Sequence, residues 1–396
     1  MFEGKNVVLG VTGSIAAYKA VDIASKLTQR GLCVDVVMTR AAQEFVAPLT
    51  FRSITHRPVV TDMFDLTSEL SVEHIALAEK ADVVVIAPAT ANTIAKLAVG
   101  IADEMICSTV LATRAPVIIA PAMDAGMWQN PVTQDNVNKL RSRGFIMVGP
   151  GYGRLASGLV GMGRLIENEE ILGAVFQVLG RNGDLAEKQI VVSAGGTQEP
   201  IDLVRFVGNR SSGKMGYAIA EAARDRGAVV TMVTGPTALP APAGVDIMQV
   251  QTAAQMRDAV LKSTAAADVL IMAAAVADYR PNTVVEGKIR REAEVLNIEM
   301  VKTSDILGEV KGSIIKVGFA AESDDLINRA TEKLKKKQLD LIVVNDISAK
   351  DSGFDTDTNR VAFIDREGKV EQLPLMLKSE IAHRILDRVV TLLAGK

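Results

Sequence analysis

Short apolar runs rich in valine and isoleucine alternate with longer amphipathic stretches along the first half of the chain. The runs span residues 7–11, 33–38, 83–87 and 117–120, and a stretch with helical periodicity covers about residues 16–30. Continuous apolar runs separated by helices are typical of parallel strands that are covered on both faces. We therefore predict an α/β domain with a doubly wound parallel sheet.

The same pattern restarts near residue 188. Four apolar runs predict strands at residues 188–193, 229–234, 269–273 and 341–344, and residues 216–226 predict a helix. Near the C-terminus, the pattern predicts a hairpin with its turn at residues 366–369, followed by a final helix over residues 378–393.

A polar segment at residues 181–187 separates these two halves. A chain of 396 residues is long enough for two domains. We expect two Rossmann-like, doubly wound parallel-sheet domains, at residues 1–183 and 188–396.

Composition excludes several classes of protein. The chain is 48% hydrophobic and 23% charged, with a formal net charge of −3, so neither disorder nor a nucleic-acid partner is expected. No apolar run reaches the length of a membrane span, and the first residues do not resemble a signal peptide. Two cysteines indicate a reducing, cytoplasmic location, and three histidines leave little for a transition-metal site.

Three of the predicted strands end in similar turns, GVTGSIAA, APATANTIAK and APAMDAGMW. Each turn is rich in small, hydroxyl or amide residues and precedes a helix, and backbone N–H groups at helix starts bind anions. Ligands of open parallel sheets bind at these carboxyl ends. The first turn lacks G-x-G-x-x-G, so the usual nicotinamide fingerprint is missing, and Ser14 alone is equally well explained as a plain helix cap.

Taken in order, the motifs GSIAAYK, EHIALA, PATANTIAK and PAMDAGMW resemble the flavin-binding cysteine decarboxylase family. The later motifs SAGGTQEPID, VRFVGNRSSGKMG, AAAVADY and GFAAE resemble phosphopantothenate–cysteine ligases. The resemblance covers essentially the whole chain. It implies the bifunctional family that makes 4′-phosphopantetheine for coenzyme A, with a flavodoxin-like FMN domain followed by a ligase domain.

The resemblance implies that FMN accepts and returns hydride while the substrate's cysteinyl carboxylate leaves as CO₂. His74 matches the catalytic histidine of the family, although a lone histidine is also explained as a half-buried helix residue. Ser14 is the preferred phosphate contact because it opens a helix. The positions that match residues near FMN are Gly13, Ser14, Thr39, Thr90, Asn92 and Ser108.

Two positions depart from the family pattern. Asp124 stands where the family has an asparagine that donates to the substrate carboxylate, and an ionised carboxylate cannot donate. Asp124 is protonated, orients other donors or expels CO₂ by repulsion, and the sequence leaves these three open. Ser157 stands where many relatives have a cysteine acid on a glycine-rich flap, and a hydroxyl is a far weaker acid than a thiol. Three alternatives stay open: Ser157 relays a proton from water, another group donates the proton, or the reaction stops at an enethiol.

In the second half, residues 208–214 fit G-x-x-x-x-G-K, but Met215 replaces the Ser or Thr of a P-loop. The segment also follows no clear strand, so a P-loop is rejected. The resemblance implies that Asn209 turns over an acyl-cytidylate, that Arg205 binds phosphate and that Lys333 and Lys337 meet the triphosphate of CTP. Lys335 and Lys336 are expected to face solvent, and Mg²⁺ is expected to arrive with CTP, with Asp278 as its protein contact.

The remaining positions that match the family's substrate and nucleotide site are Ser211, Ser212, Gly213, Ala275, Asp278, Lys288, Ser304, Asp305, Ile306, Leu307 and Phe319.

Two other readings stay open, a nicotinamide oxidoreductase and a non-catalytic regulatory relative that binds flavin or nucleotide. The resemblance further implies phosphopantothenate, cysteine and CTP as ligands. It also implies trimers of the first domain and dimers of the second, which close together as a dodecamer.

Overall fold

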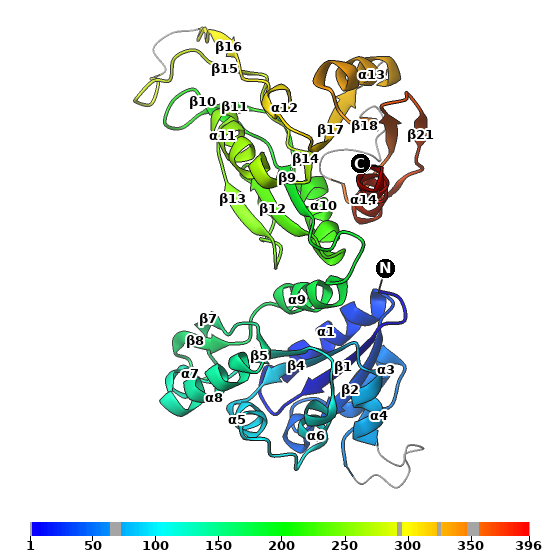
Figure 1. Ribbon diagram of the computed structural model, residues 1–396. Helices are drawn as coiled ribbons and strands as arrows, with labels where there is room; N and C mark the ends of the chain where they lie inside the picture. The colour runs from blue at the N-terminus through cyan, green and yellow to red at the C-terminus, as the bar shows by residue number, and fades with distance from the viewer. Residues whose placement is uncertain (1, 64–72, 291–294, 323–325, 347–355, 396) are drawn as a thin grey trace. The chain divides into compact units, whose positions relative to one another are not determined.

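The computed structural model describes residues 2–63, 73–290, 295–322, 326–346 and 356–395. The chain divides into two compact units, Met1–Leu179 and Gly180–Lys396. Each unit is built on one large sheet, as the two series of apolar runs predict (Figure 1).

The first unit contains a six-stranded parallel sheet in the order β3-β2-β1-β4-β5-β6. This is the Rossmann order, in which the direction of winding changes between β1 and β4. The resemblance implied a flavodoxin-like domain, and the sheet has the doubly wound arrangement that both folds share. Its strands are β1 (Asn6–Val11), β2 (Cys33–Met38), β3 (Val59–Val60), β4 (Val83–Ala89), β5 (Val117–Pro121) and β6 (Ile146–Met147).

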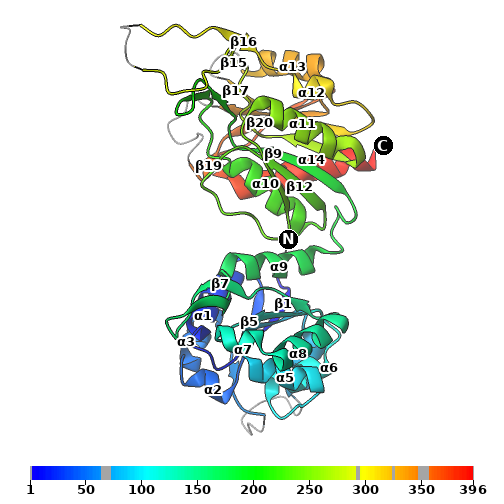
Figure 2. The same ribbon diagram turned by 90° about the vertical axis from the view of Figure 1, so that its left-hand side faces the viewer.

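Helices cover both faces of this sheet, and Figure 2 shows α1 and α3 on one side and α6 and α8 on the other. Leu9 packs in the core with α1 and α9, whereas its neighbour Val8 packs in the core with α5, α6 and α8. The helices are α1 (Ala17–Gln29), α2 (Arg40–Gln43), α3 (Pro48–Thr55), α4 (Glu73–Lys80), α5 (Ala91–Val99), α6 (Met105–Ala112), α7 (Ala125–Gln129), α8 (Pro131–Ser142) and α9 (Asn168–Gly180).

An antiparallel hairpin of β7 (Gly151–Arg154) and β8 (Val160–Arg164) forms the glycine-rich segment outside the main sheet. Strand β8 lies against the chain before α7, where Met123 N donates to Gly163 O at 2.9 Å. A Cβ at Gly163 would lie 2.3 Å from Met123 O, so only glycine permits this approach.

The second unit contains an eight-stranded sheet in the order β13-β12-β9-β14-β17-β18-β20-β21. The first six are parallel, and the predicted C-terminal hairpin joins the edge as two antiparallel strands, an addition that the sequence did not predict. The strands are β9 (Gln189–Ala194), β12 (Val229–Thr234), β13 (Asp246–Gln249), β14 (Val269–Met272), β17 (Ile315–Glu322), β18 (Leu341–Asp346), β20 (Val361–Asp365) and β21 (Val370–Gln372).

Three two-stranded sheets and several helices complete the second unit. The small sheets are β10 (Gln198–Pro200) with β11 (Phe206–Gly208), β15 (Tyr279–Pro281) with β16 (Met300–Lys302), and β19 (Thr358–Asn359) with β22 (Met376–Leu377). The helices are α10 (Lys214–Asp225), α11 (Ala253–Ser263), the 3₁₀ turn η1 (Thr264–Ala266), α12 (Ile306–Glu309), α13 (Leu326–Lys337) and α14 (Lys378–Ala394).

The polar segment at residues 181–187 is packed onto the second unit. Leu185 is fully buried in its core, and Asp184 pairs with Arg226 at 2.5 Å. Arg226 also pairs with Asp387 of α14 at 2.8 Å. The division between the two units, at Gly180, lies next to the join expected at residues 181–187, and these contacts show that this segment packs with the second unit.

Thr12 joins the turns that follow β1 and β4. Its hydroxyl donates to Pro88 O at 2.7 Å and accepts from Thr90 N at 3.0 Å, and the side chain is 1% exposed. Both neighbouring turns therefore depend on one buried hydroxyl for their spacing.

We predict that Thr12→Val lowers the free energy of unfolding of the first unit by about 2–4 kcal/mol, because two buried backbone groups lose their partner. Urea unfolding followed by the fluorescence of Trp128, the single tryptophan, measures this. Thr28→Val is the matched control, since Thr28 donates only to Ala24 O within α1. Equal destabilisation by the two variants would contradict the role of Thr12.

Candidate active sites

A cavity of about 470 Å³ lies in the first unit, lined by the turns after β1, β4 and β5 and by the β7–β8 hairpin. It is therefore at the carboxyl edge of the sheet, where the winding changes direction and open α/β sheets bind their ligands. The lining residues are Gly13, Ser14, Ile15, Ala16, Tyr18, Lys19, Thr90, Ala91, Ala122, Met123, Asp124, Met127, Arg154, Leu155, Ala156, Ser157, Gly163, Arg164 and Leu165.

The turn between β1 and α1 forms one wall of this cavity. A Cβ at Gly13 would lie 2.4 Å from the Cβ of Ala41, so a larger residue would push the turn away from its neighbour. Ser14 accepts a hydrogen bond from Ala16 N at 3.2 Å at the start of α1. A helix start, a hydroxyl and apolar walls together suit an aromatic cofactor that carries a phosphate.

Three of the six predicted cofactor residues, Gly13, Ser14 and Thr90, line the cavity. The other three have other positions in the single chain. Thr39 caps α2 by accepting from Ala42 N, and Ser108 is buried and donates to Ala102 O at 3.1 Å. Asn92 is exposed on α5.

His74 is half-buried on α4 and does not line the cavity within one chain. The thiols are also elsewhere. Cys107 is buried in α6, and burial raises the pKa of its thiol to about 11. Cys33 begins β2. Neither thiol therefore supplies the acid that the glycine-rich hairpin lacks.

The two residues that depart from the family pattern are in direct contact. Ser157, in the loop between β7 and β8, donates its hydroxyl to Asp124 Oδ2 at 2.6 Å. Asp124 also caps α7 by accepting from Gly126 N at 3.1 Å. The hydrogen bond from Ser157, and then that from Gly126, lower the pKa of Asp124, so the carboxyl is ionised at neutral pH.

In the second unit, two cavities of about 520 Å³ each adjoin along β14 and β17. Both are lined by Ala274, Val276, Asp278, Phe319 and Lys333. The predicted residues that line one or both cavities are Asn209, Ser211, Ser212, Gly213, Ala275, Asp278, Ser304, Asp305, Ile306, Leu307, Phe319, Lys333 and Lys337.

The GNRSSGKM segment folds as a loop between a strand and a helix. A short strand, β11, does precede it, in contrast to the sequence analysis, but β11 belongs to a two-stranded antiparallel sheet and not to the main sheet. Gly213 has a φ of +77° and leads into α10. Asn209 donates to Val276 O at 3.0 Å, which fixes the loop beside the end of β14.

Lysines from α13 line the same pair of cavities. Lys333 donates to Phe319 O at 2.8 Å, and Lys337 pairs with Asp305. Burial opposes ionisation of Asp305, but the hydrogen bonds from Lys337 and Gly308 N–H outweigh it and lower the pKa of Asp305. Lys336, expected to face solvent only, also lines the cavity although it is exposed.

Arg205 and Lys288 line neither cavity. The Arg205 guanidinium donates to Ile289 O at 2.7 Å and pairs with Asp202 at 3.4 Å. Asp202 also accepts from Ile289 N at 3.1 Å, so these contacts fasten the loop that carries the exposed Lys288.

Several polar residues that sequence reasoning missed also line these cavities. Lys214 and Lys302 lie within the motifs GNRSSGKM and KTSDIL, so the motifs themselves were a usable signal. Asn345, Asn359 and Lys378 come from distant strands and α14, and only the fold brings them together.

Within the described residues, no group of three or more histidine, cysteine, aspartate or glutamate side chains is arranged to hold a metal ion. A search of the same residues for a helix with the length and apolar character of a membrane span found none.

Two protein-family models match the chain. The model described as "Flavoprotein" matches residues 1–180, and that described as "DNA/pantothenate metabolism flavoprotein C-terminal domain" matches residues 185–393.

Among solved structures, the C-terminal domain of a coenzyme A biosynthesis bifunctional protein is 41% identical, with a TM-score of 0.47, and covers 54% of this chain and 100% of its own. The FMN-dependent cysteine decarboxylase SpaF is 34% identical, with a TM-score of 0.40, and covers 45% of this chain and 97% of its own.

Full-length relatives carry one common name, coenzyme A biosynthesis bifunctional protein CoaBC. The Bacillus subtilis protein is 44% identical, over 99% of this chain and 98% of its own. The Mycobacterium tuberculosis (strain H37Rv) protein is 43% identical, over 99% of this chain and 97% of its own. With these identities over nearly the whole of each protein, the chain belongs to the family of coenzyme A biosynthesis bifunctional proteins.

Proposed function

We propose that this bifunctional enzyme of coenzyme A biosynthesis joins 4′-phosphopantothenate to cysteine with CTP in residues 188–396. Residues 1–183 then decarboxylate 4′-phosphopantothenoylcysteine to 4′-phosphopantetheine with FMN. The observation that carries the proposal is the contact of Ser157 with Asp124 in a cavity at the carboxyl edge of the flavoprotein-matched sheet.

The residues around the first cavity fit FMN. Ser14 and the start of α1 suit its phosphate, and apolar side chains such as Ile15 and Leu165 suit its ring. When bound, the flavin supplies a two-electron acceptor and donor beside the thiol-bearing carbon of the substrate. Thr39, Asn92, Ser108 and His74 do not line this cavity in one chain, and we propose that neighbouring copies in a trimer complete the site.

The Asp124–Ser157 pair handles the proton in this proposal. Decarboxylation breaks the bond between the carboxylate and the adjacent carbon of the cysteinyl group. CO₂ leaves, and this adjacent carbon gains one proton that comes from solvent. A lone serine is too weak an acid to give this proton. Asp124, when it takes a proton, is a strong acid because its pKa is lowered, and Ser157 passes that proton on to the carbon. The relay combines two of the three interpretations of Asp124: its ionised form orients the Ser157 hydroxyl, and its protonated form supplies the proton.

The same contact weighs against the other two readings of the chain. A regulatory relative has no need of an ionised carboxylate that holds a hydroxyl at 2.6 Å in an open cavity. A nicotinamide oxidoreductase has no evident use for such a pair, and its fingerprint is absent from the first turn.

In the second unit, Lys333, Lys337 and Lys378 line cavities that suit a triphosphate. We propose that Mg²⁺ enters with CTP and meets Asp278, which lines both cavities. The cysteine amine then displaces CMP from the acyl-cytidylate beside Asn209. Dimers of this unit and a cytoplasmic location remain predictions from the sequence.

We predict that the wild-type enzyme releases a product that has lost only CO₂. Ser157→Ala is expected to release one that is also two hydrogens lighter, because a carbon that is not protonated also would not regain hydride, and those two electrons would stay on the flavin. Mass spectrometry of the product separates the two. Asp124→Asn is expected to slow the same step, and the double variant Asp124→Asn with Ser157→Cys to restore it. Full reduction of the product by Ser157→Ala would contradict the relay.

The pKa of Asp124 provides an independent test. We expect the wild-type pKa of Asp124 to lie below the ordinary value of 3.8, because the hydrogen bond from Ser157 stabilises the ionised carboxylate. Ser157→Ala removes this hydrogen bond, so the pKa of Asp124 is expected to rise in the variant. Carboxyl ¹³C NMR titration measures both values. The hydrogen bond is present above this lowered pKa and is lost as the pH falls through it. An unchanged pKa in the variant would show that Ser157 does not act on the carboxyl.

Lys337→Met is expected to raise the KM for CTP by about 10- to 100-fold, since it removes a charge-assisted contact. Lys335→Met on the same helix is the matched control, because Lys335 is exposed and lines neither cavity. Asp305→Asn, which removes the partner of Lys337, is expected not to raise the KM. Equal effects of the two lysine variants would contradict a nucleotide contact.

A further inference from the structure

The rim of the first cavity carries an excess of positive charge. Lys19 of α1, Arg154 of β7 and Arg164 of β8 line it, and Asp124 is the one carboxylate among the lining residues. None of these three cations has a role in the sites described above. A cavity with this balance of charge attracts an anionic ligand.

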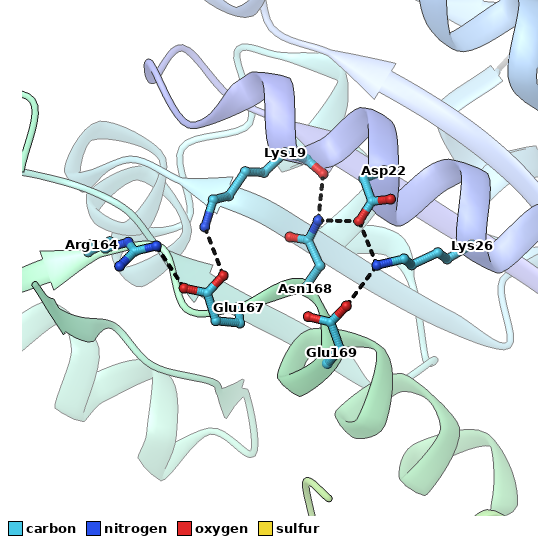
Figure 3. Close-up of polar contacts among 7 residues, drawn as sticks. All are labelled: Lys19, Asp22, Lys26, Arg164, Glu167, Asn168 and Glu169. Carbon is cyan, nitrogen blue, oxygen red and sulfur yellow. Dashed lines mark hydrogen bonds and ion pairs between the residues drawn. The ribbon is translucent and has the colours of Figure 1, made fainter. Parts of the chain in front are cut away.

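Two of these cations share one carboxylate that does not itself line the cavity. Glu167 lies between them (Figure 3), with one oxygen 2.7 Å from Arg164 Nη2 and the other 3.3 Å from Lys19 Nζ. Side-chain exposure is 55% for Glu167 but only 15% for Lys19. The lysine is thus largely withdrawn from water, while the acid that neutralises it is more than half exposed.

Each cation has a further contact besides its ion pair with Glu167. The Arg164 side chain lies over Gly153 of β7, since a Cβ at Gly153 would be 3.2 Å from Arg164 Cδ and 3.3 Å from its Nη1. The backbone of Lys19 is fixed by Asn168, which donates to Lys19 O at 3.3 Å and to Asp22 at 2.7 Å. Positions fixed in this way reduce the ordering cost of binding a ligand.

A second ion-pair cluster lies beside this one and provides a contrast. Lys26 pairs with Asp22 at 2.9 Å and with Glu169 at 2.7 Å, so it also joins α1 to the start of α9 (Figure 3). None of these three residues lines the cavity. Ion pairing of α1 to α9 therefore does not require a lysine at the cavity rim.

We infer that Lys19 and Arg164 form a subsite for a phosphate monoester, and that Glu167 occupies these cations until the ligand displaces it. The inference rests on the proposed function, whose substrate and cofactor each carry such a group. We assign the subsite to the phosphate of the pantetheine chain. Ser14, in the turn before α1, is the residue suited to the flavin phosphate, whereas Lys19 is a separate cation within the first turn of the helix.

The test is calorimetric binding of 4′-phosphopantetheine and of pantetheine, which lacks the phosphate, to the flavin-loaded protein. We expect Lys19→Met and Arg164→Met each to raise the Kd of 4′-phosphopantetheine by about 10- to 100-fold and to leave the Kd of pantetheine unchanged. Lys26→Met is the matched control and is expected to change neither. Glu167→Gln is expected to tighten 4′-phosphopantetheine, because a competing anion is removed.

Four outcomes would overturn the inference, and a fifth would overturn the proposed function. If Lys19→Met and Arg164→Met weaken the binding of both ligands equally, the two cations do not contact the phosphate. If these variants instead lose flavin, measured as absorbance at equal protein concentration, the subsite belongs to the cofactor. If Glu167→Gln weakens binding, Glu167 positions the cations and does not compete. If the wild-type protein binds 4′-phosphopantetheine and pantetheine equally, only the phosphate subsite is contradicted. If it binds neither ligand, the proposed function is contradicted.

Discussion

Parallel pairing of the strands is the constraint on which both active sites depend. Parallel strands end at one edge of the sheet, so the turns that follow them are brought together however far apart they lie in the sequence. In the first unit, the Thr12 hydroxyl joins two of these turns directly. In the second unit, the ends of β14 and β17 border both cavities.

The same constraint explains what the sequence predicts well. The strands at residues 33–38 and 229–234 were predicted with their observed bounds, because continuous apolar runs have few other uses in an α/β protein. Ser14 and Asp278, which were expected at ligand sites beyond strand ends, do line cavities, although their ligand contacts stay a prediction. Contacts between a loop and a distant element were not predictable, since they depend on how a hairpin or helix packs. The Asp124–Ser157 contact and the position of Arg205 are of this kind.

Both units balance the charge of their cavities in a similar way. Glu167 neutralises Lys19 and Arg164 in the first unit, and Asp305 neutralises Lys337 in the second. Each carboxylate shields cations that would otherwise repel their neighbours and attract unrelated anions. A ligand with several negative charges exchanges one set of ion pairs for another, so selectivity comes from the number and geometry of its phosphates.

The hydrogen bond between Ser157 and Asp124 also constrains how this chain can vary. A change at either position leaves the other without its partner, so the effects of the two single changes will not add. The side chains at positions 124 and 157 therefore depend on each other, although 33 residues separate them. Among related enzymes, the residue at one position is expected to be informative about the residue at the other.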